Sequence, residues 1–358
     1  RGRRQNQKRQ RVILKLENLP AAFAMKWKYV SNSTTKLAAV VDSETVYLPL
    51  TEGRIIALSA ETGELKWENQ IGGTVTSAPI VVEDSVVVAS RQGAVGESVG
   101  GATLRAFNKS SGITLWSKDF PDAFSAAVVE HDKRLYIPAQ DANLYVVSVT
   151  DGSIVWKKQL DTLSKARVVI DGEDLFIGAE SGQLSVLALS DGATKLQFRA
   201  EGAIRSGVAV DKKSIYFGDS EGYVYAIERA TGKLRWQIRT GAAVETTPQL
   251  AGKLLLAASF DNIVYGLEAS SGDRIWKVRL QGRLSFEPLV EGDNFIVTPL
   301  ASDRLFALSS KGKVLGSFVV SSGAIIAAPL LLDGQLYVVT DEGLVAAASQ
   351  EIEKNEKK

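Results

Sequence analysis

The amino-acid sequence predicts an all-β fold, an eight-bladed β-propeller with four antiparallel strands in each blade. Three observations support this prediction: a mark that recurs every 40 residues, four short apolar runs in each interval, and chain ends that each supply part of one further blade. Of the 358 residues, 45% are apolar and 23% are charged, which is ordinary for a chain that buries a large core. A chain of this length would otherwise suggest two or three domains, but a 40-residue repeat can join all of it into one domain.

The recurring mark is a turn with a glycine, followed four residues later by a large apolar residue. Examples are ETGELKW, which ends at Trp67, and ATGKLRW, which ends at Trp236. The turn glycines are Gly63, Gly112, Gly152, Gly192, Gly232, Gly272 and Gly312, and the tryptophans at the marks are Trp27, Trp67, Trp116, Trp156, Trp236 and Trp276. One interval is longer, and the glycine-rich residues 91–101 within it are predicted to form an inserted loop.

Each interval contains four strand-like runs separated by turn residues. In the interval 205–240 these runs are Ser206–Val210, Ser214–Gly218, Tyr223–Glu228 and Leu234–Arg239. The glycine before the last run suits a hairpin turn with a positive φ angle, and the aromatic residue is expected to fill the gap between blades. At two marks Leu196 and Gly316 replace tryptophan, so we expect looser packing there, with Phe198 and Phe318 as partial substitutes.

The chain ends predict how the ring closes. Three runs near the C-terminus, Pro329–Leu332, Gln335–Thr340 and Gly343–Ala348, lack a fourth strand, and the segment around Trp27 has no first three. Pairing them completes an eighth blade and removes exposed strand edges. We expect residues 25–349 to form one domain, residues 1–24 to be a basic arm or linker, and residues 350–358 to be a charged tail.

The motifs GRIIALSAETGELKW (53–67) and GYVYAIERATGKLRW (222–236) resemble the PQQ-like repeat, and the resemblance covers nearly all of residues 25–349. The proteins that share this repeat include quinoprotein dehydrogenases and BamB, the lipoprotein of the machine that assembles outer-membrane proteins. The resemblance therefore implies the propeller fold, whereas the function has to be argued from the site.

Enzymatic function is disfavoured by the residues that are missing. Quinoprotein alcohol dehydrogenases hold PQQ under a disulfide of adjacent cysteines, and this chain has no cysteine. The only histidine, His131, lies in the polar turn EHDKR, so a site with several histidines or a Ser–His–Asp triad is not expected. We predict no catalytic residues, cofactor or metal, and the net charge of +1 argues against nucleic acid as a partner.

The resemblance to BamB implies a non-catalytic scaffold that binds protein partners in a membrane-associated assembly of the bacterial envelope, in the periplasm or elsewhere outside the cytoplasm. Two alternatives are a ligand-sensing propeller domain of a membrane-anchored signalling protein and, less favoured, a quinoprotein dehydrogenase. Residues 1–11 hold six basic residues and no acidic residue. They form either a linker or an arm that contacts anionic lipid or follows a lost membrane anchor.

Partner binding is expected on the segments that connect one blade to the next, nine residues past each mark, and at the mouth of the central channel. The candidate residues are Lys36, Lys165, Arg167, Ile204, Arg205, Glu245, Phe286 and Glu287. Two interpretations stay open: a mildly positive mouth that attracts an acidic segment, or loop residues that pair with each other, such as Arg205 with Glu245. Ile204–Arg205 resembles the hydrophobic–arginine arrangement by which BamB-like loops dock their partner, and the inserted loop 91–101 is a second candidate.

Overall fold

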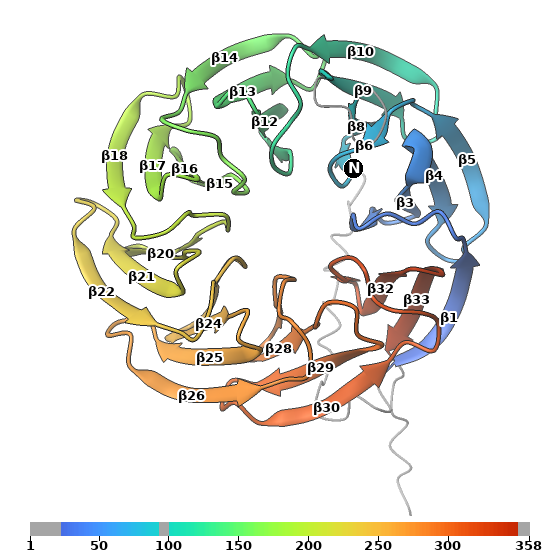
Figure 1. Cartoon of the computed structure of the whole chain (residues 1–358). Coiled ribbons are helices and arrows are strands. Elements are labelled where there is room, and N and C mark those ends of the chain that lie inside the picture. The colour runs from blue at the N-terminus through green and yellow to red at the C-terminus, as the bar shows by residue number, and fades with distance from the viewer. Residues whose placement is uncertain (1–22, 93–99, 350–358) are drawn as a thin grey trace, which may run out of the picture.

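The computed structural model describes residues 23–92 and 100–349, which form a closed ring of radial sheets (Figure 1). The predicted charged tail lies outside the described residues, as do the N-terminal arm up to residue 22 and residues 93–99 of the predicted inserted loop.

Eight antiparallel sheets make up the ring, as predicted, and we number these blades in chain order. Blade 1 contains β2 (Val40–Val41), β3 (Thr45–Leu50), η2 (Thr51–Gly53), β4 (Arg54–Ser59) and β5 (Leu65–Gln70). Blade 2 contains β6 (Thr74–Val75), β7 (Ile80–Val82), β8 (Ser85–Arg91), β9 (Ala102–Asn108) and β10 (Thr114–Phe120). Blade 3 contains β11 (Val129–His131), β12 (Arg134–Pro138), β13 (Asn143–Ser148) and β14 (Ile154–Gln159). Blade 4 contains β15 (Val169–Asp171), β16 (Asp174–Gly178), β17 (Gln183–Ala188) and β18 (Thr194–Arg199).

The strands of the other four blades are also given from the innermost strand to the outermost. Blade 5 contains β19 (Ala209–Val210), β20 (Ser214–Gly218), β21 (Tyr223–Glu228) and β22 (Leu234–Arg239). Blade 6 contains β23 (Gln249–Ala251), β24 (Leu254–Ala258), β25 (Ile263–Glu268) and β26 (Arg274–Arg279). Blade 7 contains β27 (Leu289–Glu291), β28 (Asn294–Val297), β29 (Arg304–Ser309) and β30 (Val314–Val319). Blade 8 contains β31 (Leu330–Leu332), β32 (Gln335–Thr340), β33 (Gly343–Ser349) and the N-terminal strand β1 (Phe23–Val30).

Blade 8 closes the ring as the sequence predicted. Strand β1 pairs antiparallel with β33, and Trp27 lies opposite Ala346 in this pairing. The ring of Trp27 also lies 6.2 Å from that of Tyr337 on β32. The two ends of the described chain therefore share one sheet, and β1 supplies the fourth strand that the C-terminal segment lacks.

The tryptophans are the wedges between blades. Trp236 on blade 5 packs against Gly272 of blade 6, and its indole N–H donates to the Ala269 carbonyl at 3.0 Å. Comparable indole bonds to the next blade are made by Trp27, Trp67, Trp116 and Trp276. Trp156 differs, because its buried indole nitrogen has no hydrogen-bond partner in the described part of the chain.

The two marks without tryptophan are filled by neighbouring phenylalanines. Leu196 faces Gly232, and the ring of Phe198 packs edge-on against Phe217 and Tyr225 of blade 5, with centroids 5.8 Å apart in each pair. Phe318, two residues past Gly316, packs against the core between blades 7 and 8. The structure therefore confirms that Phe198 and Phe318 pack at the two junctions that lack a tryptophan. Looser packing at these junctions stays a prediction.

The ring has two different faces. One, which we call the connection face, is formed by the segments that link consecutive blades, such as residues 200–208, and by the loops between second and third strands, such as residues 219–222. The other, the hairpin face, carries the turns between first and second strands and the glycine turns between third and fourth strands. His131 is exposed beside the turn Asp132–Lys133, where both φ angles are positive, as a tight hairpin requires.

Candidate protein-binding face

A repeated backbone hydrogen bond builds the connection face. In blade 6 the N–H of Phe260 donates to the Ala243 carbonyl at 2.9 Å, and in blade 5 the N–H of Ser220 donates to the Ala203 carbonyl at 2.9 Å. Blades 3, 4 and 7 contain the same bond at the equivalent positions. In these blades the connection is therefore held beside the loop between the second and third strands, so that side chains from neighbouring blades meet.

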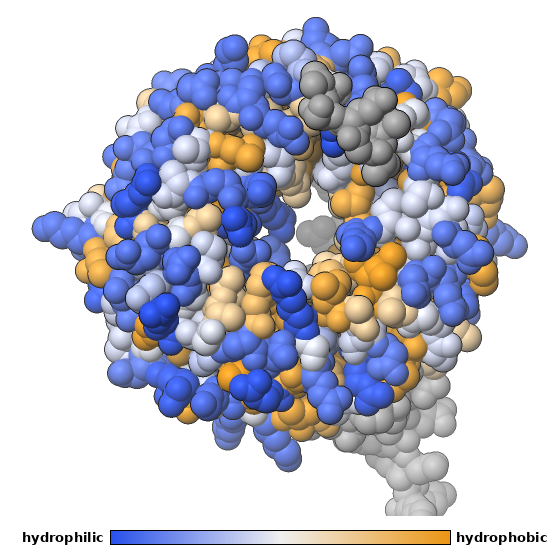
Figure 2. Space-filling model, in the orientation of Figure 1, coloured by the Kyte–Doolittle hydropathy of each residue, from blue (hydrophilic) through white to orange (hydrophobic). Residues whose placement is uncertain are grey.

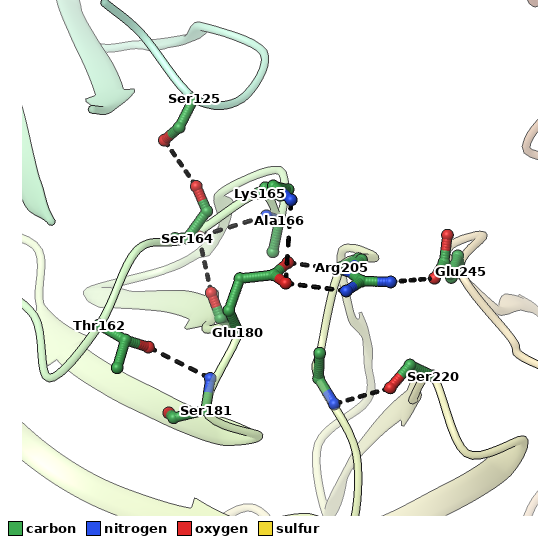
Figure 3. A network of polar contacts seen from close by, with 12 residues as sticks. Ser125, Thr162, Ser164, Lys165, Ala166, Glu180, Ser181, Arg205, Ser220 and Glu245 are labelled. Carbon is green, nitrogen blue, oxygen red and sulfur yellow. Dashed lines mark hydrogen bonds and ion pairs between the residues drawn. The ribbon is translucent and has the colours of Figure 1, made fainter. Parts of the chain in front are cut away.

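Three charged side chains from three consecutive blades form a chain of ion pairs on this face (Figure 3). Arg205 donates two hydrogen bonds to the carboxylate of Glu180, both at 2.8 Å, and a third to Glu245 at 2.7 Å. The Lys165 ammonium lies 3.9 Å from Glu180 on the other side. These hydrogen bonds hold the pKa of Glu180 below its usual value despite its partial burial, and they raise the pKa of Arg205.

The structure contains the pairing of Arg205 with Glu245 that the second sequence-based interpretation named. Both side chains are partly buried, with 35% and 23% of their surfaces exposed, and they compensate each other's charge. The surface here therefore carries alternating charges rather than a uniformly positive charge. Such a pattern favours specificity for a complementary partner over long-range attraction.

Hydroxyl groups fix the connection that carries Lys165. The Ser125 hydroxyl donates to the Ser164 carbonyl at 2.6 Å, and the Ser164 hydroxyl donates to the Gly178 carbonyl at 2.6 Å. Ser164 is fully buried, and its oxygen also accepts a bond from the Ala166 N–H at 3.2 Å. The backbone on both sides of Lys165 is thus bonded within the ring, which pre-organises the charged network.

A second ion pair spans the central channel. Arg167 of blade 4 lies 3.5 Å from Glu287 of blade 7, although two other blades separate them in the ring. The hydroxyl of Thr247 donates to Glu287, and the N–H of Gly207 donates to Thr247 at 3.1 Å. A cavity of about 350 Å³ adjoins this pair, and His131 is among its lining residues.

An aromatic–arginine stack lies next to the ion-pair network. The guanidinium of Arg283 lies 3.7 Å from the centre of the Phe260 ring. Leu300, which is exposed, bonds through its N–H to the Arg283 carbonyl at 2.8 Å. Because Phe260 is bonded to the backbone two residues before Glu245, the stack and the network form one continuous surface.

The remaining sequence-based candidates are not brought together. Lys36 is exposed on the connection into blade 1, far along the ring from Arg205. Ile204 is completely buried in the core between blades 4 and 5, and Phe286 is half-buried against the core between blades 7 and 8. Sequence reasoning missed Glu180, Phe260 and Arg283, although each occupies a loop position that the 40-residue period assigns to this face.

Neither a metal-binding cluster nor a membrane-spanning helix is found among the described residues. Within 23–92 and 100–349, no three acidic or histidine side chains cluster in a way that could hold a metal ion. The same ranges contain no helix of sufficient length and apolar character to cross a bilayer.

The family follows from the sequence itself. A family model described as the outer membrane protein assembly factor BamB matches residues 24–189, 194–317 and 261–354. The chain belongs to this BamB family. No curated protein sequence matches it.

Solved structures show the same fold as this BamB-family chain. BamB from Moraxella catarrhalis superposes with a TM-score of 0.77 at 15% identity, over 92% of this chain and 100% of that one. The computationally designed Ika8 protein gives 0.76 at 16% identity, over 91% and 100%. The quinohemoprotein alcohol dehydrogenase from Comamonas testosteroni gives 0.72 at 12% identity, over 93% and 77%. At these identities the likeness concerns the fold alone, and the three matched proteins are a BamB, a designed protein and an alcohol dehydrogenase.

Proposed function

We propose that this BamB-family chain is a non-catalytic scaffold that binds a protein partner through its connection face. We further propose that it acts outside the cytoplasm, in a membrane-associated assembly of the cell envelope such as the periplasmic side of outer-membrane-protein assembly. Family membership supports this location, because the family model is described as an outer membrane protein assembly factor.

The chain of ion pairs centred on Arg205 is the observation on which the proposed binding surface rests. Arg205 joins side chains of three blades in a fixed geometry, and the Arg283–Phe260 stack lies beside it. Arginine and aromatic residues dominate the energetics of protein interfaces, especially where they are already held in place before binding. A partner that offers both an acidic or amide group and an apolar side chain would fit this surface.

The dehydrogenase alternative is not adopted, although one of the matched structures is a quinohemoprotein enzyme. The resemblance to that enzyme class implies a lid made from adjacent cysteines, and this sequence contains none. No observation on the connection face favours a small sensed ligand over a protein.

The proposal is tested by capturing partners from native membranes in mild detergent with the full-length chain as bait. Arg205→Ala should lower the recovery of the captured partner by roughly 30-fold, the loss expected for an interface arginine worth about 2 kcal/mol. The matched control is Arg229→Ala on the hairpin face. Arg229 also bridges two carboxylates, those of Asp171 and Asp174, so its loss perturbs the fold in the same way.

Equal recovery with both variants would remove the connection face as the docking surface. A wild-type chain that captures no protein at all would contradict the scaffold function itself.

A further inference from the structure

Basic residues are concentrated on the outer rim of the ring. Strands β14, β18, β22 and β26, the outermost strands of four consecutive blades, read IVWKKQ, TKLQFR, LRWQIR and RIWKVR. They contain nine basic residues and no acidic residue, although the whole chain is balanced at 42 basic and 41 acidic residues. The outer strands of the other half, β30, β1, β5 and β10, contain four basic and two acidic residues. The rim is therefore polarised.

Among neighbouring pairs of these outer strands, β22 and β26, at the lower left of Figure 1, carry the most basic residues without an ion pair in the described part of the chain. On β18, Lys195 pairs with Asp174 at 2.6 Å and Arg199 pairs with Asp161 at 3.5 Å. The five basic residues of β22 and β26 form no ion pair within the described residues. We call these two strands the basic rim, and Figure 2 shows a largely hydrophilic outline where they lie.

Exposed aliphatic side chains lie among these charges. Leu234 begins β22 with 47% of its surface exposed, and Ile275 on β26 is 56% exposed. Along β22, Trp236 is buried and Ile238 is half-buried, whereas Leu234, Arg235 and Arg239 are exposed, so apolar and basic groups share the outward surface. Cationic groups combined with exposed aliphatic residues are typical of proteins that lie on anionic bilayers.

We propose that the basic rim lies against the surface of an anionic lipid bilayer, so that the propeller stands on its edge. A convex ring touches a flat surface over about two adjacent blades, and blades 5 and 6 supply five cations there. This orientation leaves the connection face and the central channel open. The proposal is independent of the proposed scaffold function, because it concerns a different surface and needs no protein partner.

An anionic lipid bilayer fits the basic rim better than a nucleic acid does. The outward positions of the basic rim provide no aromatic side chain on which a nucleic-acid base could stack. Its exposed large apolar groups are Leu234 and Ile275, and the transfer of such groups from water to the acyl boundary of a bilayer is favourable.

The experiment measures sedimentation of the full-length chain with vesicles of equal parts phosphatidylglycerol and phosphatidylcholine at low salt. The test variant is Arg239→Gln/Arg274→Gln/Lys277→Gln, and the matched control is Lys26→Gln/Lys28→Gln/Lys66→Gln on β1 and β5. Each removes three charges from outer strands, and both keep the basic residues 1–11. The test variant should lower the partition coefficient roughly 100-fold, since each basic group near an anionic surface is worth about 1 kcal/mol. The control should change it far less.

A second variant, Leu234→Ser/Ile275→Ser, separates lipid from other polyanions. It should weaken vesicle binding roughly tenfold and leave binding to heparin unchanged. Equal losses in the test variant and its control would overturn the proposal, as would vesicle binding that ignores the two serines. All variants lie on the exposed surface, and far-UV circular dichroism checks that each one is folded.

Discussion

Substituting Gly272 tests whether the contact between a tryptophan and the next blade holds the ring together. This glycine has a φ angle of +78°, and a Cβ atom there would lie 2.7 Å from two ring atoms of Trp236. Gly272→Ala therefore combines a backbone penalty of about 1–2 kcal/mol with overpacking of about 1–3 kcal/mol. We expect a total loss of about 2–5 kcal/mol in the free energy of unfolding.

Gly252 in the same blade supplies the control. Its φ angle is +61°, but a Cβ atom added there would have no neighbour within 4 Å. Gly252→Ala should cost only the backbone penalty of about 1–2 kcal/mol, reduced by the lower entropy of the unfolded chain. The difference between the two variants isolates the contact between blades.

Urea unfolding followed by far-UV circular dichroism measures both variants. In a Trp236→Ala background the extra cost of Gly272→Ala should disappear, because the ring that the new methyl group meets is gone. Equal destabilisation by Gly272→Ala and Gly252→Ala, or an unchanged cost of Gly272→Ala without Trp236, would refute the wedge as the source of cohesion.

Three more outcomes follow from particular contacts. Trp27→Ala should lower the free energy of unfolding by about 3–5 kcal/mol in urea titrations, because the side chain is buried at the closing blade and its indole bond is lost. Trp236→Phe should cost about 1 kcal/mol more than Trp156→Phe in the same assay, since only the former removes a formed indole bond. Arg205→Gln should cost about 1 kcal/mol at neutral pH. Arg205 holds the pKa of Glu180 below its ordinary 4.5, so this difference should shrink as the pH of the titration falls below that value.

The fold could be predicted because the same physical contact is encoded many times. Each glycine turn and tryptophan repeats one junction between blades, so a departure such as Leu196 does not hide the pattern. Closure was predictable for a related reason, since β1 has a mark but no preceding strands and the C-terminal segment has strands but no mark.

The site was only partly predictable because its contacts join residues from different repeats. Glu180 lies in a turn whose sequence, ESGQ, gives no sign of a role, and it meets Arg205 only because the hydrogen bonds of the connection face bring them together. The ion pair of Arg167 with Glu287 requires the curvature of the closed ring, which no local pattern contains. The named candidate Ile204 lies on the connection into blade 5 and is buried in the core between blades 4 and 5, which the pattern of the connection does not reveal.

The blades are alike in structure but not in chemistry, and this difference indicates where function is concentrated. Eleven residues past the marks, blades 8, 1, 2 and 3 have alanine, whereas blades 4 to 7 have Arg167, Gly207, Thr247 and Glu287. The network around Arg205 and the basic rim belong to the same part of the ring. Since the fold requires only the shared residues, these unshared ones are free to serve binding. A partner on the connection face of blades 5 and 6 would then lie directly beside the bilayer that the rim of those blades contacts.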